Sequence, residues 1–323
     1  MTTPIYQRPV DILQTLVRMD TTNPPGNEVI CINYLDGLLK EAGFATTILA
    51  KDPNRPNLIT RLKGRGEAPA LVMQGHVDVV TTMGQNWEQP PFSGEILDGV
   101  LWGRGSLDMK GGVTMMTSAV MRAKAEGFVP AGDIILTIVA DEEAGSDYGA
   151  RFCDGGAPGT VAGAKYAIGE GGGSSSFIGD QRFYNVMVAG SRSAGCRLPR
   201  AGRAWVVTLR GKGSMAKLGH VLSTIESTRL PVHVTPVMEQ MLAVLAEHTA
   251  APTDELIAKL RDPRQTDAVL DQLIEQGISL ARPLDALLHD TVSPTVVRGG
   301  DRRCPPQRDH AGTRWPAAAR LYL

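Results

Sequence analysis

The sequence predicts an α/β fold in which helices and strands alternate along much of the chain. Residues 133–140 form a near-continuous apolar run, typical of a strand that is buried on both faces of a parallel sheet. Amphipathic helical patterns alternate with short β-rich runs, which favours a layered arrangement of helices on that sheet. The 36 glycines and 21 prolines among 323 residues indicate many loops between the elements.

The first half of the chain supplies the elements of this layered sheet. Residues 9–19 place apolar side chains on one helical face, and a turn cluster follows at 23–26. Asn27 is then expected to cap a second helix, which ends at Gly43. The remaining expected elements are a helix at 111–125 and strands at 44–49, 57–62, 70–74, 133–140 and 165–168.

The pattern changes after Gly179, which indicates a second domain of strands and helices. Strands are expected at 183–188 and 204–209, and helices at 215–225, 236–247, 253–260 and 266–276. Residues 190–204 and 302–323 are rich in arginine and differ from their surroundings. They are either a basic loop and a disordered tail or the product of a shifted reading frame. We divide the chain into 1–182, 183–292 and 293–323.

The composition argues against several broad classes of protein. With 33 Lys+Arg against 34 Asp+Glu, the formal net charge of -1 argues against a nucleic-acid binder. The four cysteines contain no Cys-x-x-Cys pair, which argues against a disulfide scaffold and fits a reducing cytoplasm. No secretion signal is seen, and no apolar run approaches the roughly 18 residues of a membrane span. We therefore expect a cytoplasmic protein without a membrane partner.

A histidine and an aspartate follow the strand expected at 70–74. His76 and Asp78 lie two positions apart, and such residues point the same way in an extended segment. His76 can then offer a ring nitrogen to a metal while Asp78 orients the ring. A purely structural pair at the end of a strand is the alternative interpretation.

Three further acidic segments are each expected at the end of a predicted strand, where open α/β sheets gather their sites. Asp108 lies in a glycine-rich loop that lacks the Walker pattern of a phosphate-binding loop. Glu142 and Glu143 can divide metal binding and proton transfer between them, with a solvated loop as the alternative. Glu170 lies in a glycine loop without the dinucleotide-binding spacing. One imidazole with several carboxylates suits zinc, cobalt or manganese.

The order of these motifs resembles a known family. His-x-Asp, Gly-Arg-Gly-x-x-Asp-Met-Lys-Gly-Gly, Asp-Glu-Glu-x-Gly-Ser and Gly-Glu-Gly follow one another as in the dinuclear-zinc aminoacylases, deacetylases and carboxypeptidases. The resemblance covers about 9–182 well and continues loosely to about Arg298. It implies a zinc-exopeptidase-like layered catalytic domain, of which 1–182 is the first portion. Residues 183–292 would be an inserted α+β lid through which the family often forms homodimers.

The resemblance also implies the chemistry. Two Zn²⁺ ions are expected, with Co²⁺ or Mn²⁺ as substitutes, and their ligands would be His76, Asp108, Glu143 and Glu170. Asp108 would bridge both ions, and Asp78 would orient the histidine. Glu142 would be the general base that deprotonates a metal-bound water. That water would attack the amide carbon of an N-acylated amino acid or a small peptide, so the resemblance implies a metallo-hydrolase.

The chain departs from the family pattern at three places, one of which is the basic stretch 190–204, where a lid strand is expected. The lid motif that carries a histidine in the family has none here at 211–215, and neither His220 nor His310 matches a family histidine. The catalytic domain is expected to resume after the lid and to supply a last histidine ligand. We therefore expect a truncated or frame-disturbed member, incomplete at its C-terminus. An inactive or binding-only relative is the alternative to the hydrolase.

Overall fold

The computed structural model describes residues 3–156, 159–171, 175–186, 188, 197–201, 214–294, 296–298 and 318–322. The chain forms two compact units, of which the first ends at Glu170 and the second begins at Gly171. The boundary predicted after residue 182 lies inside the second unit, and the predicted division into three parts stays a prediction.

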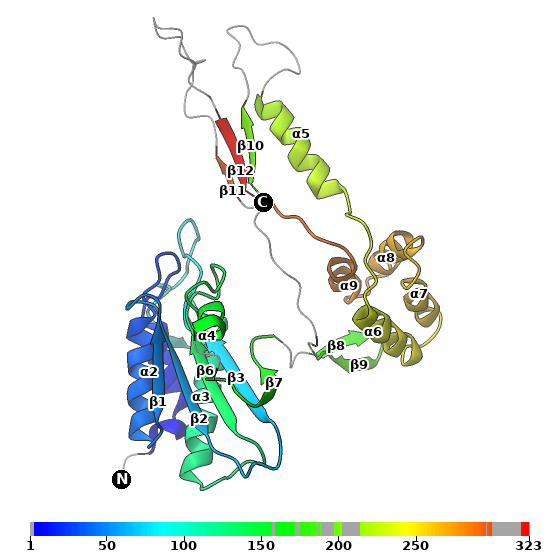
Figure 1. Cartoon of the computed structure of the whole chain (residues 1–323). Coiled ribbons are helices and arrows are strands. Elements are labelled where there is room, and N and C mark those ends of the chain that lie inside the picture. The colour runs from blue at the N-terminus through cyan, green and yellow to red at the C-terminus, as the bar shows by residue number, and fades with distance from the viewer. Residues whose placement is uncertain are drawn as a thin grey trace, which may run out of the picture. The chain divides into compact units, whose positions relative to one another are not determined.

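The first unit is built on one five-stranded sheet (Figure 1). Its strands are β1 (Thr46–Ala50), β2 (Pro56–Leu62), β6 (Ile134–Val139), β3 (Ala70–His76) and β7 (Ala164–Ile168), in that spatial order. β3 runs parallel to β6 and β7, whereas β2 pairs antiparallel with both β1 and β6. The predicted α/β class is confirmed, and the sheet is mixed.

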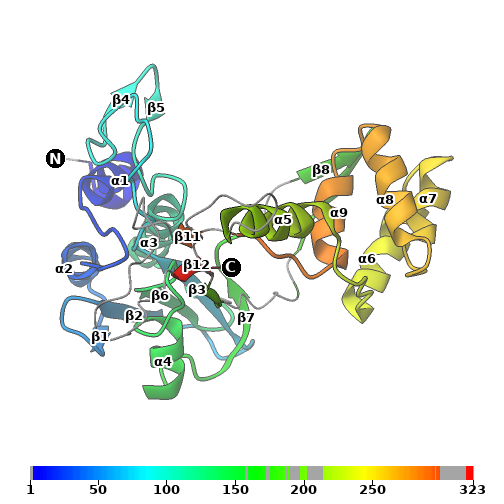
Figure 2. The ribbon, with the colours of Figure 1, turned by 90° about the horizontal axis from the view of Figure 1, so that it is seen from above.

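Helices lie on both faces of this sheet (Figure 2). One face carries α2 (Val29–Glu41) and α3 (Lys110–Ala125), and α1 (Pro9–Val17) packs against α3. The short helix α4 (Ala150–Gly156) lies on the opposite face. The remaining elements of the unit are the 3-10 helix η1 (Ile5–Gln7) and a hairpin of β4 (Ile96–Leu97) and β5 (Val100–Leu101).

The apolar run of β6 forms the centre of the core, as its sequence predicts. Leu136 and Ile138 belong to the large cluster beneath the helices, whereas Ile135 packs with Val72 and Ile59 in a second cluster. Successive side chains of a strand point to opposite faces, so an uninterrupted apolar run fits a strand that is covered twice. This strand delivers the acidic turn that follows it to the edge of the sheet.

One local prediction in this unit is wrong. Asn27 was expected to cap the second helix, but α2 begins at Val29, and no side chain accepts a hydrogen bond at its first turn. Glu28 occupies the residue before the helix, and its carboxylate is bound elsewhere, by Arg55. The residue at the cap position is therefore Glu28, and its carboxylate takes part in a tertiary ion pair instead of a cap.

The second unit is mostly helical. It contains α5 (Ser214–Ser227), α6 (Pro236–Glu247), α7 (Thr253–Lys259), α8 (Thr266–Glu275) and α9 (Ala281–Leu288). Its strands are the hairpin β8 (Ser175–Ile178) with β9 (Gln181–Tyr184), and a sheet of β10 (Arg197–Ala201), β12 (Ala318–Tyr322) and β11 (Val296–Arg298). Ile178 of the hairpin packs into a core with Leu242, Leu270 and Leu284.

Most of the predicted elements of this unit are present, with differences at their ends. The four expected helices are confirmed, whereas α9 was not predicted. The strand expected at 183–188 is β9, which ends at Tyr184. The strand expected at 204–209 lies outside the described residues. Of the two arginine-rich segments, only β10 and β12 are described. Among the described residues, no helix is long and apolar enough to cross a membrane.

Asp133, just before β6, offers a test of the sheet's electrostatics. Its carboxylate accepts hydrogen bonds from the Gly64 N–H at 2.8 Å, from Arg61 at 2.8 Å and from Lys63 at 3.0 Å. These donors, led by the Gly64 N–H, hold the pKa of Asp133 well below its ordinary value. The ionised carboxylate therefore stabilises the fold above the unfolded-state pKa of about 3.9, and this contribution is lost as the pH falls.

The variant Asp133→Asn keeps the shape of this side chain and removes its charge. We expect the variant to unfold at a lower urea concentration than the wild type at pH 7, with a difference that narrows below about pH 4. Urea unfolding curves at pH 7 and pH 3 measure both differences. Equal differences at the two pH values would contradict the assignment.

Candidate metal and catalytic site

His76 is the last residue of β3 and is almost completely buried. Its Nε2 atom lies 3.1 Å from Oδ1 of Asp108 and 3.4 Å from Oε2 of Glu170. A ligand atom from each of these three residues lies within 4.8 Å of the other two. Oε2 of Glu142 lies 3.9 Å from the same nitrogen. Four of the predicted site residues therefore meet around one imidazole edge.

Strand direction explains why three of these segments meet. β3 runs parallel to β6, with His76 opposite Val139, and parallel to β7, with Met73 opposite Ile168. The carboxyl ends of the three strands therefore reach the same edge of the sheet. The acidic turn after β6 and Glu170 after β7 arrive there from segments far apart in the sequence.

The glycine-rich loop before α3 brings Asp108 to this edge. Lys110, at the start of α3, is fully buried, and its Nζ donates hydrogen bonds to the carbonyl oxygens of Leu16 at 3.0 Å and Met19 at 2.7 Å. Gly105 has a φ of 82°, and a Cβ there would lie 2.7 Å from a methyl group of Val79. A residue without a side chain is therefore required where the loop passes the segment after β3.

Asp78 lies behind the histidine and is fully buried. One oxygen lies 3.3 Å from His76 Nδ1 and accepts the Glu142 N–H at 3.1 Å. The other accepts Asn23 Nδ2 at 2.8 Å and the Glu143 N–H at 3.1 Å. Burial opposes ionisation, but the hydrogen bonds from His76 and Asn23 lower the pKa of Asp78. Asp78 therefore orients the histidine ring, whose Nδ1 also lies 3.0 Å from the Asp78 backbone carbonyl oxygen, and its carboxylate orients the backbone of the two glutamates.

Several carboxylates lie close together at the site, and they raise the pKa values of neighbouring groups. Burial alone would lower the pKa of His76, but the hydrogen bond and charge of Asp78, with the charges of Glu142 and Glu170, raise it to about 9. Burial first, and then the charge of Asp108, raises the pKa of Glu143 to about 7. Burial and a hydrogen bond to Asp108 raise the pKa of Glu170. Such a site attracts cations.

The six site residues predicted from the sequence lie in one region, but only three of them form the cluster. His76, Asp108 and Glu170 form the cluster, and Glu142 borders it. Glu143 is not part of the cluster, and its backbone N–H is bound to Asp78. Asn23 was missed as a contributor. Its Asn-Pro-Pro-Gly turn was recognised, but turn chemistry gives no sign that this side chain reaches a carboxylate 55 positions away.

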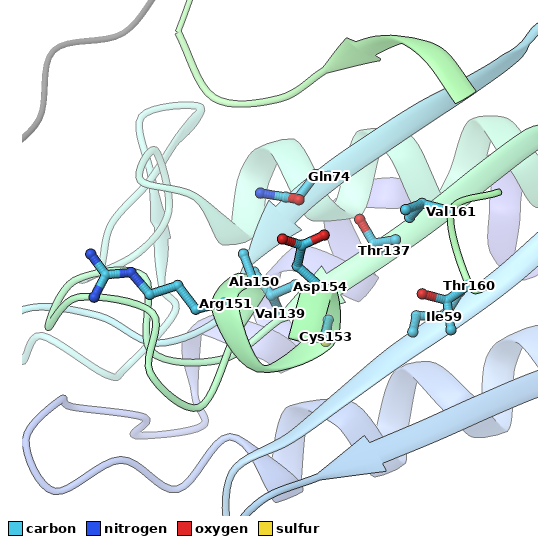
Figure 3. Close-up of a pocket in the computed structure, with 10 residues that line it drawn as sticks. All are labelled: Ile59, Gln74, Thr137, Val139, Ala150, Arg151, Cys153, Asp154, Thr160 and Val161. Carbon is cyan, nitrogen blue, oxygen red and sulfur yellow. The ribbon is translucent and has the colours of Figure 1, made fainter. Parts of the chain in front are cut away.

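A separate pocket lies between α4 and the sheet (Figure 3). Its volume is about 380 Å³. Its lining residues are Ile59, Gln74, Thr137, Val139, Ala150, Arg151, Cys153, Asp154, Thr160 and Val161. None of the six predicted site residues lines this pocket, so the cavity is distinct from the cluster around His76.

Solved structures share the fold of this chain. The di-peptidase Dug1p of Saccharomyces cerevisiae aligns with a TM-score of 0.58 at 16% identity, covering 99% of this chain and 68% of that one. The metallo-carboxypeptidase Sso-CP2 of Sulfolobus solfataricus aligns with a TM-score of 0.57 at 16% identity, covering 100% and 70%. Human carnosine dipeptidase 1 aligns with a TM-score of 0.55 at 16% identity, covering 99% and 71%. At this identity these likenesses show the fold alone.

A curated relative and a family model match this chain in sequence, and the family model covers most of it. Over 144 residues the chain is 35% identical to a probable succinyl-diaminopimelate desuccinylase of Staphylococcus aureus, a stretch that is 44% of this chain and 34% of that relative. The match thus spans about a third of the length of the curated relative. Residues 72–283 match Peptidase family M20/M25/M40, and this range includes every residue of the cluster. Because this match spans more than half of the sequence, the chain belongs to Peptidase family M20/M25/M40.

Proposed function

We propose that this chain is a metal-dependent hydrolase that cleaves an amide bond in an N-acylated amino acid or a small peptide. The observation that carries the proposal is the cluster of His76, Asp108 and Glu170, with Glu142 at its border. Membership of a peptidase family supports the reaction class. The Staphylococcus aureus relative, which is named as a desuccinylase, supports an N-acylated substrate.

The residues present fit a divalent transition metal. One imidazole nitrogen and two carboxylate oxygens within 4.8 Å of one another match the three protein ligands of many catalytic zinc sites. We assign the first ion to His76, Asp108 and Glu170. A second ion would be held by Asp108 and Glu143, as the resemblance to the dinuclear family implies. Zn²⁺ is the expected metal, and Co²⁺ or Mn²⁺ accept the same donor types.

The side chains around the cluster divide the work of amide hydrolysis. Divalent ions bound there would polarise the substrate carbonyl and acidify the attacking water. Glu142, whose side chain is 46% exposed, takes the proton from that water and returns it to the leaving amine. Asp78 holds His76 by Nδ1, so that Nε2 faces the cluster. Because His76 is buried, its ring is held in the orientation that points Nε2 at the cluster.

We also propose the domain roles implied by the resemblance. Residues 1–182 are assigned to the first portion of the catalytic domain, 183–292 to a lid that forms a homodimer, and 293–323 to a short return segment with an Arg/Pro-rich tail. The separate apolar core of the second unit supports a lid that folds around its own side chains. Light scattering on the eluting chain tests the dimer, and a monomer at all concentrations would contradict it.

Zinc should stabilise the folded chain through His76. A ligand that binds only the folded state stabilises it by about 2.7 kcal/mol at a concentration of 100 Kd, so zinc should raise the Tm of the metal-free protein. His76→Ala should abolish this rise. His233→Ala is the matched control, because His233 is exposed in the second unit and pairs with Asp290. Thermal melts with and without zinc give the comparison.

The outcomes separate the two interpretations of the chain. The same zinc response in His76→Ala and in the wild type would refute the assigned site. A zinc response without any hydrolysis of N-acetyl amino acids or dipeptides would favour the binding-only relative over the hydrolase.

Glu142→Gln tests the general base. The amide cannot accept a proton, so kcat should fall by about 10²–10⁴-fold while zinc still raises the Tm. Glu126→Gln serves as the control, since Glu126 lies on the surface beside α3 and pairs with Arg122. Release of the free amine measures both variants. Retention of most of the wild-type kcat in Glu142→Gln would exclude this residue as the base.

A further inference from the structure

We propose that Arg55 and Asn23 are positioning residues that fix the acidic turn 141–148, and with it Glu142 and Glu143, at the metal cluster. The inference deepens the proposed function, on which it rests for the roles of the two glutamates. The observation that carries it is a buried polar network that holds both ends of this turn.

Arg55 is the buried cation that joins Glu28 to Asp141 in this network. It is 7% exposed, and its guanidinium donates to both carboxylate oxygens of the fully buried Glu28, at 2.7 Å from Nη2 and 3.1 Å from Nε. The same Nη2 lies 3.1 Å from Oδ1 of Asp141, the first residue of the turn. Glu28 also accepts the backbone N–H of Asp141 at 3.2 Å. Both the side chain and the backbone of Asp141 are therefore fixed.

Asn23 joins this network to the site. Its Nδ2 donates to Oδ1 of Asp141 at 3.0 Å and to Oδ2 of Asp78 at 2.8 Å. Asp78 in turn receives the N–H groups of Glu142 and Glu143. One amide group thus links the carboxylate that starts the turn to the carboxylate that holds its next two residues. The neutral amide of Asn23 uses both of its hydrogens here, whereas a carboxylate at this position would repel Asp78 and Asp141.

The far end of the turn returns to the same residues. The ring of Tyr148 lies under the Arg55 guanidinium, with 4.7 Å between the guanidinium carbon and the ring centroid. The Tyr148 N–H donates to Oδ2 of Asp141 at 3.1 Å. Asn57 donates to the Tyr148 carbonyl oxygen at 2.8 Å and accepts the Ala140 N–H at 3.0 Å, which closes the base of the turn.

The turn at 23–26 is shaped around the guanidinium. Gly26 has a φ of 86°, and a Cβ there would lie 2.3 Å from Arg55 Nε. Only glycine allows the backbone to pass this close to the fork. Next to it, the backbone N–H of Asn23 donates to the Val79 carbonyl oxygen at 2.9 Å, which places the turn alongside the segment after His76.

Stability alone is a poor explanation of this arrangement. A buried ion pair gains little over apolar residues of the same volume, because both charges must leave water. Here a single cation, Arg55, pairs with two carboxylates, Glu28 and Asp141, so the buried charges do not balance. The network therefore lowers the free energy of unfolding relative to an apolar core, and its value lies in the geometry that it fixes. Asp141 has a φ of 61°, a left-handed conformation that is uncommon for residues other than glycine. The network holds it there, and the peptide groups of both glutamates then face Asp78.

Hydrogen–deuterium exchange of the full chain without metal tests the positioning role directly. Arg55→Lys keeps the charge and removes the two-pronged donor. Asn23→Ala breaks the second link without altering any charge, and it serves if the arginine variant fails to fold. Arg61→Lys is the matched control, because Arg61 lies on β2, the strand that directly follows Arg55, but pairs with Asp133 at the strand's other end.

We expect peptides that span 140–149 to exchange on the order of tenfold faster in Arg55→Lys and Asn23→Ala, with exchange in α3 and β6 unchanged. Arg61→Lys should leave the turn as in the wild type. Unchanged exchange in the turn, or an equal acceleration throughout the first unit, would overturn the proposal, since the second result describes general destabilisation.

Kinetics connects the loosened turn to catalysis. In an active wild type, Arg55→Lys should lower kcat on the order of tenfold or more, because small displacements of reacting groups are costly. KM should stay within about twofold, because substrate contacts are not removed. A wild-type kcat in a variant with a loosened turn would overturn the positioning role. A wild type without hydrolysis would instead refute the proposed function, and the exchange experiment would still decide whether the network holds the turn.

Discussion

The carboxylate of Asp78 is the interaction on which the candidate site depends. It is fully buried, and a bare carboxylate in such a place costs several kcal/mol. Its donors offset that cost: the His76 ring, the Asn23 amide and the N–H groups of Glu142 and Glu143. They come from three separate parts of the sequence. Folding the first unit and assembling the site are therefore largely the same event.

The parts of the site that sequence analysis predicted are those with a local signal. The apolar run before Asp141 identifies a central strand, and a strand that is covered on both faces must deliver its next residues to the sheet edge. His76 and Asp78 lie two positions apart, a spacing that reads directly as one side of an extended segment. Within the cluster of His76, Asp108 and Glu170, the strand-end rule accounts for His76 and Glu170, whereas Asp108 arrives on the loop before α3, and nothing local could give the distances.

The parts that escaped prediction depend on distant partners. Asn23 reaches Asp141 across 118 positions, and Arg55 reaches Glu28 across 27. No pattern of hydrophobicity or turn residues encodes such contacts. The incorrect prediction of a cap at Asn27 is a similar case. The residue at the cap position is Glu28, and its carboxylate binds Arg55, a distant partner. Strand direction was also hidden, since β1, β2 and β6 pair antiparallel although their patterns suit either direction.

The strand β7, which precedes Glu170, is held less firmly than the strand that carries His76. Within the described residues it pairs only with β3, and all five of its side chains are exposed, yet it carries Glu170 at its end. His76, in contrast, ends a strand with neighbours on both sides. Local opening occurs most easily where few contacts must break. A cation bound by both His76 and Glu170 would link β7 to β3 at the edge of the sheet. Separation of β7 from β3 and dissociation of the ion would then be coupled.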